Sequence, residues 1–120
     1  MMKIDRNKIR NMFDGRCAYC GKPLDDNFHI DHVKPIYRGR EGYPLSSRQG
    51  EDIIENMMPS CPRCNLWKKT FTVEEFRQEI SAQAERVRRD CAGYRLAEDF
   101  NLVHTTGHDV SFWFERHKPK

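Results

Sequence analysis

The spacing of apolar residues near the start of the chain predicts one short helix. In residues 5–13, "DRNKIRNMF", apolar side chains recur at near-helical spacing until Gly15 ends the pattern. A second helix is predicted to begin in "CPRCNLWKK", residues 61–69, because Pro62 suits the first turn of a helix.

A longer helix is predicted from Thr72 to Gly93. Thr72 and Glu75 form a capping-box pattern, in which each side chain accepts from the backbone N–H of the other. Apolar residues then recur at intervals of three or four, at Val73, Phe76, Ile80, Ala84, Val87 and Cys91. Cys91, on this stripe, is interpreted as a small core residue and not as a ligand or nucleophile. Residues 95–104, "RLAEDFNLVH", predict a further helix.

Strand patterns are shorter and lie between the helical ones. "NFHID", residues 27–31, predicts one strand, and the alternating "VSFWF", residues 110–114, predicts another. Between them, residues 33–52 are rich in proline, glycine and serine and predict a long irregular segment, with a return strand near Ile36 and Tyr37. Separate helices and strands in a chain of 120 residues favour one α+β domain over 1–120.

Charge changes this picture by suggesting a partner. Charged residues make up 32% of the chain, above the roughly 25% of an average protein, and the formal net charge is +3. A polyanion is therefore the expected partner class, although the positive residues of the long helix are equally well explained as a solvated face. The positive residues cluster at Lys34, Arg38 and Arg40; Arg63, Lys68 and Lys69; Arg86, Arg88 and Arg89; and Arg116, Lys118 and Lys120.

The chain lacks an apolar run near the roughly 20 residues that cross a bilayer, and its start does not resemble a secretory signal, so we expect no membrane association and a cytoplasmic protein.

Four of the five cysteines form two CxxC pairs. In a reducing compartment such pairs favour metal ligation over disulfides. Four thiolates would saturate a tetrahedral zinc ion, which predicts a structural zinc site formed by Cys17, Cys20, Cys61 and Cys64.

The segment between the cysteine pairs carries a family resemblance. "HIDHVKPIYRGR", "DIIEN" and "CPRCNLWKK" resemble the HNH endonucleases of the ββα-metal fold, and their position between two CxxC pairs is similar to short HNH proteins of bacteriophages and mobile elements. The resemblance covers about residues 17–80. It implies a treble-clef-like, zinc-stabilised domain with flanking helices, in which residues 81–120 form an extension.

The resemblance also implies roles for individual residues. Asp31 and Asn65 correspond to ligands of a catalytic divalent metal, Mg²⁺ or Mn²⁺, and His32 corresponds to the general base. Asn56 corresponds to the residue that steadies the loop holding the base, although it could merely end a helical stretch. Phosphate contacts to DNA, taken as double-stranded, are expected from Lys68, Lys69, Arg63, Arg38 and Arg40.

The chemistry of these residue types agrees with such roles, but strand geometry sets a condition. A histidine suits proton removal from water near neutral pH, and oxygen ligands suit a hard cation. Adjacent residues of a regular strand point to opposite faces, so Asp31 and His32 can serve one phosphate only where the strand ends or twists. A regular strand would instead pair His29 with Asp31 as the metal ligands.

The sequence therefore predicts a metal-dependent DNA endonuclease. Two other functions remain open: a noncatalytic zinc module that binds nucleic acid or a protein, and a nuclease subunit of a phage DNA-packaging complex. The late histidines, His104, His108 and His117, match no motif and are interpreted as surface residues.

Overall fold

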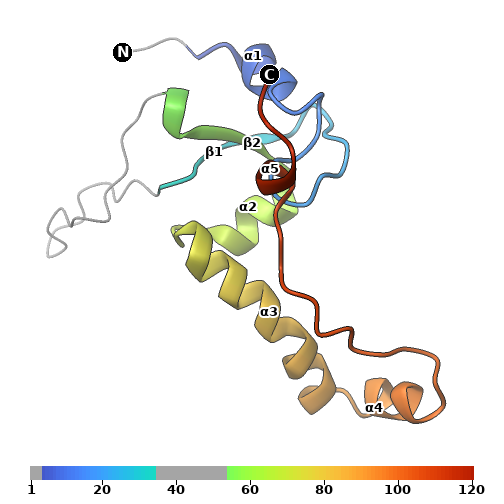
Figure 1. Cartoon of the computed structure of the whole chain (residues 1–120). Coiled ribbons are helices and arrows are strands. Elements are labelled where there is room, and N and C mark those ends of the chain that lie inside the picture. The colour runs from blue at the N-terminus through green and yellow to red at the C-terminus, as the bar shows by residue number, and fades with distance from the viewer. Residues whose placement is uncertain (1–3, 35–53) are drawn as a thin grey trace, which may run out of the picture.

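A computed structural model describes residues 4–34 and 54–120 as an α+β fold in which a two-stranded sheet is surrounded by helices (Figure 1). The elements follow in the order α1 (Arg6–Asn11), β1 (His29–His32), the 3₁₀ turn η1 (Ile54–Asn56), β2 (Met57–Ser60), α2 (Pro62–Lys68), α3 (Val73–Asp90), α4 (Ala92–Asp99) and α5 (Trp113–Arg116). None of the helices in the described ranges is long and apolar enough to cross a membrane.

The strand predicted in "NFHID" is confirmed with shifted bounds, and its partner is a segment that the pattern did not predict. β1 pairs with β2 in an antiparallel register that sets His29 opposite Ser60 and His32 opposite Met57. The sequence of β2, "MMPS", is short and contains Pro59, which argues against a strand. The return strand expected near residues 36 and 37 lies outside the described residues.

Pro59 is tolerated in β2 because its backbone nitrogen and carbonyl face away from β1. Its carbonyl accepts a hydrogen bond from the backbone N–H of Ala18 at 2.9 Å. Since the N–H and C=O of a strand residue point to the same side, the proline nitrogen faces away from β1 and no ladder bond is lost. The bond instead docks the turn between Cys17 and Cys20 against the hairpin.

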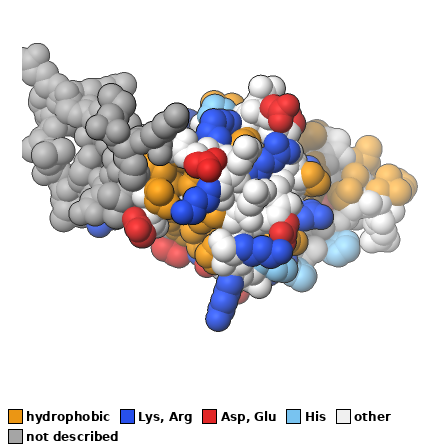
Figure 2. Space-filling model, turned by 90° about the horizontal axis from the view of Figure 1, so that it is seen from above, with side chains coloured by type: hydrophobic (Ala, Val, Ile, Leu, Met, Phe, Trp, Pro, Cys, Tyr) orange, Lys and Arg blue, Asp and Glu red, His pale blue; other side chains and the backbone are white. Residues whose placement is uncertain are grey.

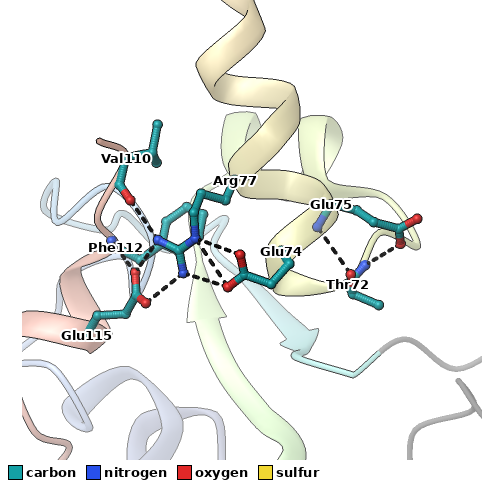
Figure 3. Close-up of polar contacts among 7 residues, drawn as sticks. All are labelled: Thr72, Glu74, Glu75, Arg77, Val110, Phe112 and Glu115. Carbon is teal, nitrogen blue, oxygen red and sulfur yellow. Dashed lines mark hydrogen bonds and ion pairs between the residues drawn. The ribbon is translucent and has the colours of Figure 1, made fainter. Parts of the chain in front are cut away.

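The predicted starts of α1, α2 and α3 are confirmed. Asp5 caps α1, where Ile9 is buried, and Pro62 occupies the first turn of α2. The capping box of α3 is present, with the Glu75 N–H donating to Thr72 Oγ1 at 3.2 Å and the Thr72 N–H donating to Glu75 Oε1 at 3.0 Å (Figure 3).

The predicted end of α3 and the predicted burial of Cys91 are wrong. α3 ends at Asp90, and Cys91 has extended backbone angles and an exposed side chain. Figure 1 shows why: the second half of α3 projects away from the sheet, so the apolar stripe loses its cover there. Phe76 is buried at 1% exposure, whereas Val87 is 40% exposed. The further helix expected over 95–104 begins earlier and is shorter, as α4.

The strand predicted in "VSFWF" is also wrong, because this segment forms the start of α5. The N–H groups of Trp113 and Phe114 donate to the carbonyls of Tyr19 and Ala18 at 2.9 and 2.8 Å. These bonds attach the segment to the cysteine turn instead of to a neighbouring strand. The alternation did identify an inward residue, since Phe112 is 2% exposed.

An aromatic cluster joins this C-terminal segment to the core. The ring of Tyr19 makes edge contacts with Phe76, Phe112 and Phe114 at centroid distances of 5.4, 5.3 and 5.8 Å. Phe76 comes from α3, and the last two come from the segment after α4. Residues 110–114 are therefore part of the core around the cysteine turn and not a peripheral extension.

Arg77 on α3 holds the same segment by polar contacts (Figure 3). Its guanidinium donates to the Val110 carbonyl at 2.6 Å and forms ion pairs with Glu115 at 2.6 Å and Glu74 at 3.1 Å. It also lies 4.9 Å from the ring centroid of Phe112. One side chain thus connects α3 to both ends of the segment that carries the aromatic residues.

We expect Arg77→Met to lower the free energy of unfolding by about 1 kcal/mol, because a partly exposed charged network is lost. Thermal denaturation followed by circular dichroism should show a lower Tm. Arg89→Met is the matched control, since the Arg89 side chain pairs with the adjacent Asp90 and both are 64% exposed. An equal loss in the two variants would contradict the tethering role.

The Arg77 effect should also depend on pH. The Arg77 side chain hydrogen-bonds Glu115 and lowers the pKa of that carboxyl. A group whose pKa is depressed by folding stabilises the protein above its unfolded pKa, and that stability is lost as the pH falls through the lower, folded pKa. The difference in Tm between wild type and Arg77→Met should therefore be present at neutral pH and shrink in acid.

Candidate metal centre and active site

Two segments distant in sequence bring four cysteine sulfurs together. Within the described ranges, the sulfurs of Cys17, Cys20, Cys61 and Cys64 all lie within 4.8 Å of one another, and Cys20 Sγ and Cys61 Sγ are 3.8 Å apart. A tetrahedral zinc ion with Zn–S distances of about 2.3 Å requires sulfurs about 3.8 Å apart. The four side chains therefore fit a closed, four-thiolate metal site of the structural kind.

Local backbone features aim these sulfurs inward. Gly21 follows the first pair with φ of 77°, a left-handed conformation that favours glycine, and a Cβ there would lie 2.3 Å from a ring carbon of Trp113. Cys61 caps α2, its sulfur accepting from the Cys64 N–H at 3.4 Å, while the Cys61 N–H donates to Cys17 Sγ at 3.3 Å. The turn and the helix start are thus joined through their sulfurs.

The close approach of the thiols shifts the pKa values of Cys17 and Cys64. A hydrogen bond from the Cys64 side chain lowers the pKa of Cys17 to about 4, and the same bond raises the pKa of Cys64. Burial raises the pKa of Cys20. Binding a dipositive ion would favour the thiolate form of all four side chains at neutral pH.

Asp31 is the centre of a second polar cluster, which lies between β1 and α2. Its side chain is buried, and the Lys68 ammonium lies 3.4 Å from Oδ1 and 3.2 Å from Oδ2. The Tyr19 hydroxyl donates to Oδ2, and Lys68 also donates to the His32 carbonyl at 3.0 Å. Burial raises the pKa of Asp31, and the nearby Lys68 charge opposes that shift.

β1 ends at His32, directly after Asp31, although both residues still belong to the strand and pair with β2. The strand end that the sequence reasoning required is present, and a shared role for the two side chains stays a prediction. His32 is partly buried and His29 is exposed. Asp31 is buried two residues further along the strand, and the pairing of His29 with Asp31 as metal ligands stays a prediction.

Asn56 supports the loop after His32. Its amide oxygen accepts from the Lys34 N–H at 2.9 Å, its amide nitrogen donates to the Lys34 carbonyl at 2.9 Å, and its own carbonyl accepts from the Val33 N–H at 2.9 Å. These three bonds hold both residues that follow His32 to the start of β2.

The remaining predicted residues lie on α2 or outside the described residues. Asn65 is partly buried one turn before Lys68, and its side-chain amide makes no hydrogen bond within ranges 4–34 and 54–120. Arg63 and Lys69 are exposed, whereas Lys68 is 0% exposed. Arg38 and Arg40 lie outside the described residues.

The sequence reasoning missed Tyr19 as part of this site. It stands between the two cysteines of the first pair, is 2% exposed, and has a pKa raised by burial and then by the Asp31 charge. A tyrosine in a CxxC turn has no catalytic signature, and only the docking of the turn on β1 brings its hydroxyl to Asp31. No sequence signal would have found this contact.

The chain is thus a small ββα protein with a four-cysteine cluster at the junction of its hairpin and helix. Residues 17–71 match the family model of the HNH endonucleases.

A similar curated protein carries the same family name. YoqL of Bacillus subtilis (strain 168), named as an SPbeta prophage-derived HNH endonuclease, is 26% identical over 85 residues. The match covers 61% of this chain and 31% of YoqL, so the chain spans less than a third of the relative's length. No solved structure matches the chain.

We expect metal removal to unfold the protein. Zinc binding at structural sites contributes roughly 10–16 kcal/mol in small peptides, comparable to a whole domain's net stability of about 5–15 kcal/mol. Metal analysis should find one zinc per chain, and a strong chelator or Cys61→Ser should abolish the cooperative thermal transition. Cys91→Ser, an exposed cysteine outside the cluster, is the control and should leave both metal content and Tm unchanged. A chelated protein that melts like the untreated one would disprove the role of the metal.

Proposed function

We propose that this protein is a metal-dependent DNA endonuclease whose active site lies where β1 ends against α2. The observation that carries the proposal is the position of Asp31 and His32, adjacent at the end of β1, beside a helix that the cysteine cluster orients. The match of residues 17–71 to the family model of the HNH endonucleases supports the same reaction class. Zinc is the expected ion of the cysteine cluster.

His32 would act as the general base and remove a proton from the attacking water. Asn56 keeps the backbone after His32 in place through its bonds to residues 33 and 34. Attack in line on the phosphorus then leaves a 5′-phosphate and a 3′-hydroxyl. In this proposal the imidazole acts at the end of a rigid strand and not on a free loop.

Asp31 and Asn65 would hold Mg²⁺ or Mn²⁺, because carboxylate and amide oxygens suit a hard cation. When bound, that ion neutralises charge that develops on the phosphate and the departing oxygen. The Lys68 ammonium already lies 3.2 Å from Asp31 Oδ2. The negative charge of the substrate phosphate would therefore help to balance a divalent cation beside this pair.

DNA contacts are proposed for the exposed residues of α2, Arg63 and Lys69. Lys68 is the third basic residue there, and a contact with phosphate would require its ammonium to leave Asp31. Figure 2 shows Lys and Arg side chains spread over one face with acidic side chains between them, and not gathered in one continuous patch. Affinity from a few phosphate contacts carries little base information, so weak sequence preference is expected.

A role as the nuclease subunit of a phage packaging complex is a second proposal. It is favoured by the prophage origin printed in the name of YoqL. In that case the isolated chain would cleave DNA weakly, and a partner protein would restore the rate.

We expect His32→Ala to reduce plasmid cleavage by roughly 10²- to 10⁴-fold, the usual contribution of a general base. Cleavage would be followed by gel electrophoresis with Mg²⁺ or Mn²⁺ and with the metal chelated. His108→Ala is the control, because His108 is an exposed histidine far from β1 in sequence. Wild-type cleavage by His32→Ala would remove His32 from the mechanism, and absence of cleavage and of DNA binding by the wild type would contradict the nuclease proposal.

The salt dependence of DNA binding tests the proposed contacts. Removing one phosphate contact should lower the slope of log K against log salt concentration by about 1. Arg63→Ala and Lys69→Ala should each show this change in fluorescence anisotropy titrations with a short duplex. Lys8→Ala, an exposed lysine of α1 outside the positive clusters, serves as the control, and an unchanged slope in the α2 variants would place the DNA elsewhere.

A further inference from the structure

Tyr19 lies where the cysteine turn contacts Asp31. Its side chain is 2% exposed, and its hydroxyl donates a hydrogen bond to Asp31 Oδ2. The residue is flanked by Ala18 and Cys20, so its backbone is held by the cluster of sulfurs. Its phenol therefore links the cysteine cluster to the Asp31 carboxylate on β1.

The two partners of Asp31 constrain its carboxylate differently. Lys68 Nζ lies at similar distances from the two oxygens, 3.4 Å from Oδ1 and 3.2 Å from Oδ2, so it does not distinguish them. Tyr19 bonds Oδ2 alone. The phenol thereby fixes the rotation of the carboxylate about its own axis and leaves Oδ1 as the oxygen with more free acceptor capacity.

The ring of Tyr19 is itself held from three sides. Phe76, Phe112 and Phe114 make edge contacts with it, a geometry that aromatic pairs favour. Phe112 and Phe114 lie beyond residues 17–71, the part that matches the family. The C-terminal segment, residues 110–117, therefore completes the support of a side chain in the site.

We infer that Tyr19 is a positioning residue, whose hydroxyl, clamped by the C-terminal aromatic rings, sets the orientation in which Asp31 presents its free oxygen to the divalent cation. This inference rests on the proposed function, in which Asp31 is a ligand. It goes beyond that function because it assigns the orientation of the ligand to a residue of the cysteine turn and to the C-terminal segment.

The test is Tyr19→Phe in the full-length, zinc-loaded protein, with binding of Mn²⁺ measured by electron paramagnetic resonance. The substitution keeps the ring and removes only the hydroxyl. Removing a hydrogen-bond partner of a metal ligand typically weakens metal affinity by 10- to 100-fold, so we expect a loss of about tenfold or more. In cleavage assays the Mn²⁺ concentration for half-maximal rate should rise by the same factor, while the rate at saturating Mn²⁺ recovers.

Two further variants make the result specific. Tyr94→Phe removes the hydroxyl of another tyrosine, which contacts Thr105 at 3.2 Å, and should bind Mn²⁺ like the wild type. Phe114→Leu keeps the Tyr19 hydroxyl but removes one ring contact, and should weaken Mn²⁺ binding on the order of twofold. If Tyr19→Phe fails to fold, Phe114→Leu decides the question.

The outcomes separate this inference from the proposed function. Asp31→Asn should weaken Mn²⁺ binding strongly if Asp31 is a ligand. Weaker binding in Asp31→Asn with unchanged or tighter binding in Tyr19→Phe would overturn the positioning role and leave the proposed ligand in place. Unchanged binding in Asp31→Asn would overturn the ligand assignment itself, and the role of Tyr19 with it.

Discussion

The convergence of four cysteine sulfurs is the constraint on which the rest of this structure depends. Those sulfurs come from a tight turn and from the first residues of α2, segments more than 40 positions apart in the sequence. A sheet of only two short strands cannot stabilise a domain on its own. The cluster sets the angle at which α2 approaches β1, and thereby the place where Lys68 reaches Asp31.

A buried charge pair then depends on that placement. Lys68 is fully buried, and such a residue is tolerated only with a close counter-charge and further hydrogen bonds. Asp31 supplies the charge and the His32 carbonyl supplies an acceptor. The same side chains that stabilise the α2–β1 contact are those proposed for catalysis, so stability and function are coupled here, and a substitution of Lys68 would affect both.

The C-terminal segment supplies core residues to the part of the chain that matches the family model. Phe112 and Phe114 return from beyond α4 to pack on Tyr19, and Arg77 holds the segment that carries them. The part that matches the family therefore does not contain its whole core. The chain leaves the core along α3, reverses at α4 and returns to the core before α5 (Figure 1).

The sequence by itself determined the features that depend on local geometry or on ligand chemistry. Capping at Thr72, the proline start of α2, the turn at Gly21 and the grouping of the four cysteines are set by neighbours in sequence or by spacing typical of a metal site. Only the tertiary structure decided that Pro59 lies in a strand, that Cys91 is exposed, and that Tyr19 meets Asp31. Each of these depends on which surface is covered by a distant segment, and hydrophobic periodicity records that a face is apolar without recording whether anything packs against it.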